Sequence, residues 1–133
     1  MFTVSASTLR RVLWLDAASG LGMGLSHLAL SEPLSGWTGI PATWLQVAAL
    51  VVFGAASLAA WLASRAEPPA GGVKLLAVGN FAWVAASLWL AFGAGLSLTA
   101  LGLGWVLAQA LMVLVLAELE WAGARRAQGL AMA

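Results

Sequence analysis

Four long apolar stretches run along this chain, separated by short breaks rich in polar residues, glycine or proline. The apolar stretches cover residues 12–30, 44–63, 73–92 and 98–121. A helix needs about 20 mostly apolar residues to cross the hydrocarbon core of a bilayer. The pattern therefore predicts an all-α fold in which residues 1–133 form one four-transmembrane-helix bundle.

The three breaks predict how these helices are joined. The first, SEPLSGWTGIPATW, holds two prolines and two glycines, and its Trp37 and Ile40 indicate a short segment lying in the membrane interface. The second, SRAEPPAGG, is a polar loop with paired prolines and paired glycines. The third, FGAGLS, is a tight glycine turn, which makes the last two spans antiparallel neighbours.

Composition favours a membrane environment. Hydrophobic residues make up 62% of the chain and charged residues 8%, against about 45–50% and about 25% in soluble domains. So few charges cannot cover a surface that faces water, and lipid is the expected solvent. The chain contains no cysteine, which excludes disulfides and thiolate metal sites.

The basic residues predict how the chain is oriented. They are Arg10, Arg11, Arg65, Lys74, Arg125 and Arg126. These residues precede the first span, flank the second break or follow the last span, whereas the other two breaks contain no lysine or arginine. By the positive-inside rule, both termini are expected on the cytoplasmic side.

Eight tryptophans occur in the chain. Seven of them lie near the predicted interfaces, where an aromatic belt is typical of membrane proteins. Trp83 lies near the middle of the third span instead. It either fills the core or lines a cavity.

Polar residues inside the spans are informative because lipid does not tolerate them unpaired. Residues seven or eleven positions apart return to the same side of a helix. The pairs that share a face in this way are Asp16 with His27, Gln46 with Ser57, Asn80 with Ser87, and Gln109 with Glu120. All four polar faces are expected to turn towards the inside of the bundle.

A polar layer is expected near the cytoplasmic end. Asp16 and Asn80 lie roughly 6–10 Å in from that end, at about 1.5 Å per residue. Glu118 and Glu120 point about half a turn apart, so one of them is expected to join the layer beside a nearby arginine. The favoured interpretation is a clamp of interhelical hydrogen bonds. The alternatives are contact with another protein, or a proton- or cation-coupled site in which Asp16 titrates and Asn80 positions a ligand.

His27 is the only histidine, so no metal or haem site is expected within one chain. A capping or interface role, with Glu32 as partner, is favoured over a ligand role. Gly20 and Gly24 have the GxxxG spacing that lets helices approach closely, inside the bundle or in a dimer.

Motifs for catalysis are absent from the sequence. It has no phosphate loop, no nucleophile elbow and no HExxH motif, and no basic patch large enough for nucleic acid. We therefore expect no catalytic residue, no metal and no cofactor, and we do not expect an enzyme.

Three short motifs carry a family resemblance. They are the glycine-rich SGLGMGLSHLAL of the first span, the proline break SEP directly after it, and GIP at residues 39–41. In these positions and in its four-span pattern, the chain resembles the small four-helix bacterial membrane proteins grouped as DoxX-like. The resemblance implies a multi-pass protein of the bacterial cytoplasmic (inner) membrane, with an accessory role beside redox-associated complexes. It implies no catalytic residue.

Two functions are expected from these observations. The first is an accessory or scaffold subunit that packs with other membrane proteins or with itself in a homo-oligomer. The alternative is an oligomeric carrier or binder of a small apolar or cationic molecule that uses the cytoplasmic polar layer.

Overall fold

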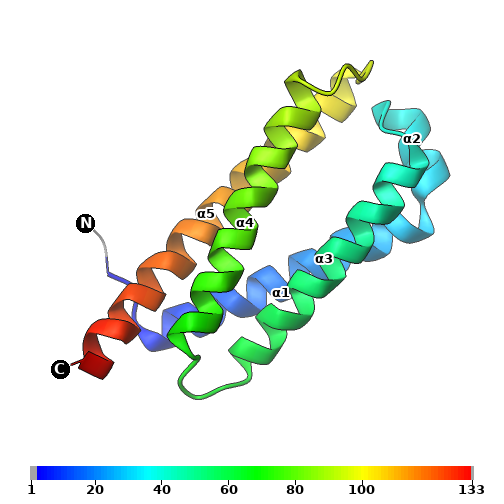
Figure 1. Ribbon diagram of the computed structural model, residues 1–133. Helices are drawn as coiled ribbons and strands as arrows, with labels where there is room; N and C mark the ends of the chain where they lie inside the picture. Colours follow the sequence, from blue (N-terminus) through cyan, green and yellow to red (C-terminus); the bar gives the residue numbers. More distant parts are fainter. Residues whose placement is uncertain (1–2, 133) are drawn as a thin grey trace.

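Helices make up almost all of the fold. The computed structural model describes residues 3–132, and within that range it contains five α-helices and no strand (Figure 1). They are α1 (Ala6–Ala29), α2 (Ser31–Thr38), α3 (Ala42–Ala63), α4 (Ala70–Phe92) and α5 (Ala100–Met132). The all-α prediction is confirmed, while residues 1, 2 and 133 of the predicted domain lie outside the described range.

The number of apolar helices differs from the prediction. In the described part of the chain, three helices, α3, α4 and α5, are long and apolar enough to cross a membrane, and four were expected. The 24 residues of α1 are sufficient in length. Its hydropathy is lower because it contains Arg10, Arg11 and Asp16 and a second half rich in glycine and serine. The fifth helix also continues well beyond the predicted end of the last span at residue 121.

Local signals explain where the helices begin and end. The Ser5 hydroxyl caps α1 by accepting a hydrogen bond from the Thr8 amide at 3.2 Å. Pro41 and Pro69 directly precede α3 and α4, where a missing amide hydrogen costs nothing. Gly39 ends α2 with a φ of 81°, the left-handed conformation that glycine adopts easily. The expected interfacial segment is therefore a short helix.

The helices form two pairs. Helix α1 packs mainly on α3, and α4 packs mainly on α5. The pairs converge at the end that holds both termini and the α3–α4 connection, and they spread apart towards α2 and the α4–α5 connection (Figure 1). We call these the converging end and the spread end. All six basic residues belong to helix ends and connections at the converging end.

Close packing by small residues holds α1 against α3. A Cβ atom on Gly20 would lie 3.1 Å from the Cβ of Ala56, and one on Gly24 would lie 2.7 Å from the Phe53 ring. The GxxxG pair thus contacts α3 inside the chain. The larger buried apolar cluster lies at the converging end and includes Leu9 and Leu62.

The spread end has a smaller apolar cluster and a different attachment. The Thr99 amide donates to the Thr38 carbonyl at 3.0 Å, which ties the end of α2 to the start of α5. Gly102 makes this approach possible, because a Cβ there would overlap the Thr38 carbonyl oxygen. Thr99 thus binds the end of α2 through its amide and, at the Trp37 carbonyl, through its hydroxyl, and Gly102 lets α5 come this close.

Candidate functional site

A buried polar cluster joins three helices at the converging end. Asn80 of α4 donates from Nδ2 to Asp16 Oδ2 of α1 at 2.8 Å and to Glu120 Oε2 of α5 at 2.9 Å. All three side chains are buried, Glu120 completely. Because one nitrogen bonds both oxygens, the two carboxylate oxygens lie no more than 5.7 Å apart, the sum of these distances. We call this group the carboxamide clamp.

The tertiary structure selects one of the two candidate glutamates. Glu120 faces the clamp, whereas Glu118 lies on the exposed side of α5. The other carboxylate oxygen of Glu120, Oε1, is buried without a hydrogen-bond partner. Arg10 does not pair with Asp16 but donates from Nε to the Ala63 carbonyl at the end of α3, at 3.2 Å. The clamp thus holds two acids by one amide rather than by an ion pair.

A small cavity of about 130 Å³ adjoins the clamp. Asp16 and Asn80 line it, together with Ser19, Gly20 and apolar side chains of α3 and α5. This space is large enough for a few water molecules, which need polar partners of this kind. Within the described residues, no three His, Asp or Glu side chains come together as metal ligands do.

The polar face expected on the second span does not turn inward, so that part of the prediction is wrong. Gln46 and Ser57 are both exposed. The Ser57 hydroxyl donates to the Phe53 carbonyl of its own helix at 2.8 Å, and Gln46 Nε2 donates to Ser31 Oγ at 3.1 Å. The buried face of α3 is built from small residues such as Ala49 and Ala59, whose size lets α1 approach.

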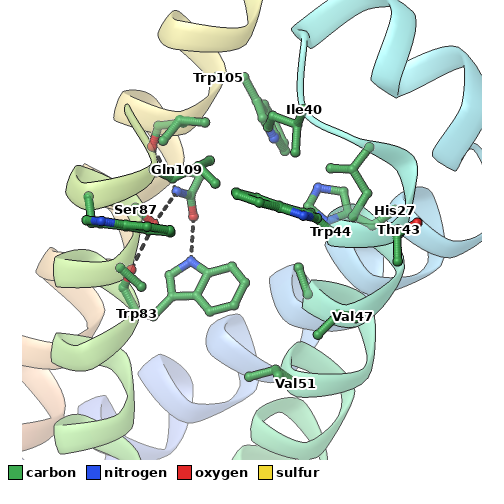
Figure 2. A pocket seen from close by; sticks show the side chains of 16 residues that line it. His27, Ile40, Thr43, Trp44, Val47, Val51, Trp83, Ser87, Trp105 and Gln109 are labelled. Atoms are coloured by element: carbon green, nitrogen blue, oxygen red, sulfur yellow. Dashed lines mark hydrogen bonds between the residues drawn. The ribbon is translucent and has the colours of Figure 1, made fainter. Parts of the chain in front are cut away.

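A second polar cluster joins α4 to α5 nearer the spread end. Gln109 Nε2 donates to Ser87 Oγ at 2.9 Å and to the Val106 carbonyl at 2.8 Å. Gln109 Oε1 accepts from the indole nitrogen of Trp83 at 2.8 Å, and the Ser87 hydroxyl donates to the Trp83 carbonyl at 2.8 Å (Figure 2). Both the nitrogen and the oxygen of the Gln109 side-chain amide are therefore hydrogen-bonded within the chain.

A large cavity of about 620 Å³ opens at the spread end. Its 16 lining residues are mostly apolar and include Trp89. Trp44, Trp83 and Trp105 also line it (Figure 2). The rings of Trp44 and Trp89 stack across α3 and α4, 6.2 Å apart and 12° from parallel. Because Trp89 is 56% exposed, the cavity opens on the outer surface of the bundle. We call it the aromatic cavity.

His27 lies in the wall of this cavity. Its side chain is 5% exposed, and neither Nδ1 nor Nε2 has a hydrogen-bond partner. The ring meets Trp105 edge to face, with centroids 6.3 Å apart. The expected pairing with Glu32 is wrong, because Glu32 is exposed at the start of α2 and does not reach the imidazole.

Sequence reasoning did not foresee the aromatic cavity. The only signals were the mid-span position of Trp83, for which a cavity lining was one of two interpretations, and the isolated His27. The cavity depends on the distance between two helix pairs, which leaves no pattern in either pair alone.

No protein-family model, curated protein or solved structure matches the chain. The fold and site nevertheless define a class. This is a helical protein with three helices apolar enough to span a membrane, a buried polar cluster at one end and an aromatic cavity at the other.

Proposed function

We propose that the protein binds a small, lipid-soluble molecule in the aromatic cavity. The observation that carries the proposal is the cavity, whose volume of about 620 Å³ lies in the range of about 300–1,000 Å³ usual for small-molecule sites. A molecule dissolved in lipid would enter between α3 and α4 without crossing water. The proposal keeps the expected binding of an apolar molecule but moves its site from the polar layer to the spread end. It includes no enzymatic step and no cofactor.

We also propose that α1 is a fourth span and that both termini are cytoplasmic. The gathering of all basic residues at the converging end supports this orientation. In this arrangement α2 lies in the opposite interface. The resemblance to DoxX-like proteins supports a bacterial cytoplasmic membrane as the location.

Labelling of single cysteines tests this topology, because the chain has no native cysteine. We expect a membrane-impermeant maleimide to label Ser97→Cys in intact cells and to spare Ser7→Cys. Labelling of both positions would mean that α1 does not span the membrane.

Binding of tritiated naphthalene to the purified protein in detergent tests the proposed function. We expect saturable binding that is lost in Ala86→Trp, which fills the cavity from α4. The matched control is Ala85→Trp, an exposed alanine next to it that does not line the cavity. Binding that never saturates, or that is equal in the two variants, would rule out a specific site.

An accessory or scaffold subunit is the second candidate. It is favoured by glycines on the outer surface, since Gly22, Gly54, Gly79 and Gly104 have no atom near the position a Cβ would take. Small residues on an outer face let another helix approach closely. Cross-linking in native membranes tests this candidate: a defined oligomer or partner supports it, and a monomer throughout contradicts it.

A further inference from the structure

His27 has hydrogen-bonding capacity that the folded chain does not use. A neutral imidazole carries one donor nitrogen and one acceptor nitrogen. Both nitrogens of His27 are buried and unpartnered at the wall of the aromatic cavity. Leaving such groups unpaired costs stability, so a group that enters the cavity with a complementary atom would recover that cost.

The buried polar side chains of the opposite wall, Ser87 and Gln109, offer no such capacity. Gln109 has bonded its amide nitrogen twice and its oxygen to the Trp83 indole. The Ser87 hydroxyl both accepts from Gln109 and donates to a backbone carbonyl. Of the buried polar side chains that line the cavity, His27 is thus the one with unpartnered atoms.

The remaining walls select for shape and charge. The parallel rings of Trp44 and Trp89 present flat aromatic faces, and aromatic rings prefer stacked or edge-to-face neighbours. No Asp, Glu, Lys or Arg lines the cavity. A charged ligand would lose its hydration without gaining a counter-ion.

We infer that the cavity takes planar, uncharged, lipid-soluble molecules that carry a carbonyl or hydroxyl oxygen, and that His27 bonds this oxygen. The imidazole donates to a carbonyl through its N–H or accepts from a hydroxyl at its other nitrogen. The inference rests on the proposed function and names the class of ligand for the same cavity.

The affinities of naphthalene and 2-naphthol test the inference. The two probes differ by one hydroxyl, and 2-naphthol is uncharged at pH 7. We compare the affinity ratio of 2-naphthol to naphthalene in the unaltered protein and in His27→Phe, which keeps an aromatic ring against Trp105. The ratio is expected to fall about five-fold in the variant, the ordinary contribution of one hydrogen bond. Taking a ratio removes the difference in how the two probes partition into detergent.

Two further variants make the outcome decisive. Thr43→Val removes another hydroxyl from the cavity wall and is expected to leave the ratio unchanged. His27→Gln restores a hydrogen-bonding side chain and is expected to keep most of the preference for 2-naphthol, even if His27→Phe does not fold. An unchanged affinity ratio in His27→Phe would overturn the role of His27. So would complete loss of the preference for 2-naphthol in His27→Gln, or a fall of the ratio in Thr43→Val. Unsaturable naphthalene binding would instead overturn the proposed function.

Discussion

The two ends of this bundle bury polar groups in opposite ways. At the converging end, Asn80 bonds both Asp16 and Glu120 and thereby ties α1, α4 and α5 together. At the spread end, His27 is buried to nearly the same extent but bonds nothing. A buried group with partners supports packing, whereas one without partners costs stability. Glu120 Oε1 also lacks a partner, but of the two only His27 faces the large cavity, and an unpartnered group in such a wall is the better indicator of a binding site.

Side-chain size explains why the ends differ. The converging end is filled by leucines and alanines that pack across both helix pairs. At the spread end, bulky tryptophans lie between α3 and α4 and leave the aromatic cavity among them. The clamp joins α1, α4 and α5, whereas the cavity lies between the two helix pairs, which spread apart towards α2 (Figure 1).

Asn80→Ala should cause the largest fall in the free energy of unfolding. It leaves two buried acids facing each other without their shared donor, and each buried polar group left unsatisfied costs about 1–3 kcal/mol. We expect a lower free energy of unfolding, measured by denaturant titration in detergent. Gln46→Ala, which removes an exposed amide with one hydrogen bond, is the control and should lose far less. Equal losses would mean that the clamp does not hold the helices.

Gly102→Ala should have the next largest effect, and it acts at the spread end. The added methyl group collides with the Thr38 carbonyl, and overpacking of this kind costs about 1–3 kcal/mol. Loss of stability should be accompanied by weaker naphthalene binding, because Ile40, which lies just after α2, lines the cavity. In Gly104→Ala the added methyl group points into open space. This variant should be neutral, or its stability should rise by up to about 1 kcal/mol because alanine has the higher helix propensity. Similar behaviour of the two variants would contradict the role given to α2.

Gln109→Leu should have an intermediate effect. Leucine has nearly the same size but leaves the Trp83 indole nitrogen without its acceptor. The expected loss is about 1 kcal/mol, the cost of one unsatisfied buried donor. Thermal unfolding followed by circular dichroism measures it. A loss as large as that of Asn80→Ala would mean that both polar clusters hold the bundle equally.

His27→Phe should have the smallest effect on stability. The side chain has no hydrogen bond to lose, so we expect a change within about 0.5 kcal/mol, or a small gain, because an unpaired polar group is removed. The same unfolding measurement, without ligand, decides the matter. A loss above about 1 kcal/mol would show that His27 supports the fold, and the contrast between the two ends would then disappear.

Much of the fold can be predicted from the sequence. Apolar runs, prolines and glycines locate most helix ends to within three residues, because helix ends depend on local backbone chemistry. The exceptions are the start of α1 and the end of α5, where the helix continues past the apolar run into polar sequence. Helical periodicity also placed Asp16, Asn80 and a glutamate at one depth, and the structure brings Asp16, Asn80 and Glu120 together. The count of four apolar helices exceeded the three observed, since the charges of α1 outweigh its length.

Tertiary structure alone decided the rest. Periodicity shows which residues share a face, but the rotation of each helix about its axis depends on how its neighbours pack. That rotation turned Gln46 and Ser57 outward, because the alanines of α3 allow α1 to come closer. It also placed Glu120, rather than Glu118, in the clamp. The sequence by itself determined the helices and the depth of their polar groups. Contacts between distant segments determined the separation of the two pairs, and with it the aromatic cavity and the free imidazole of His27.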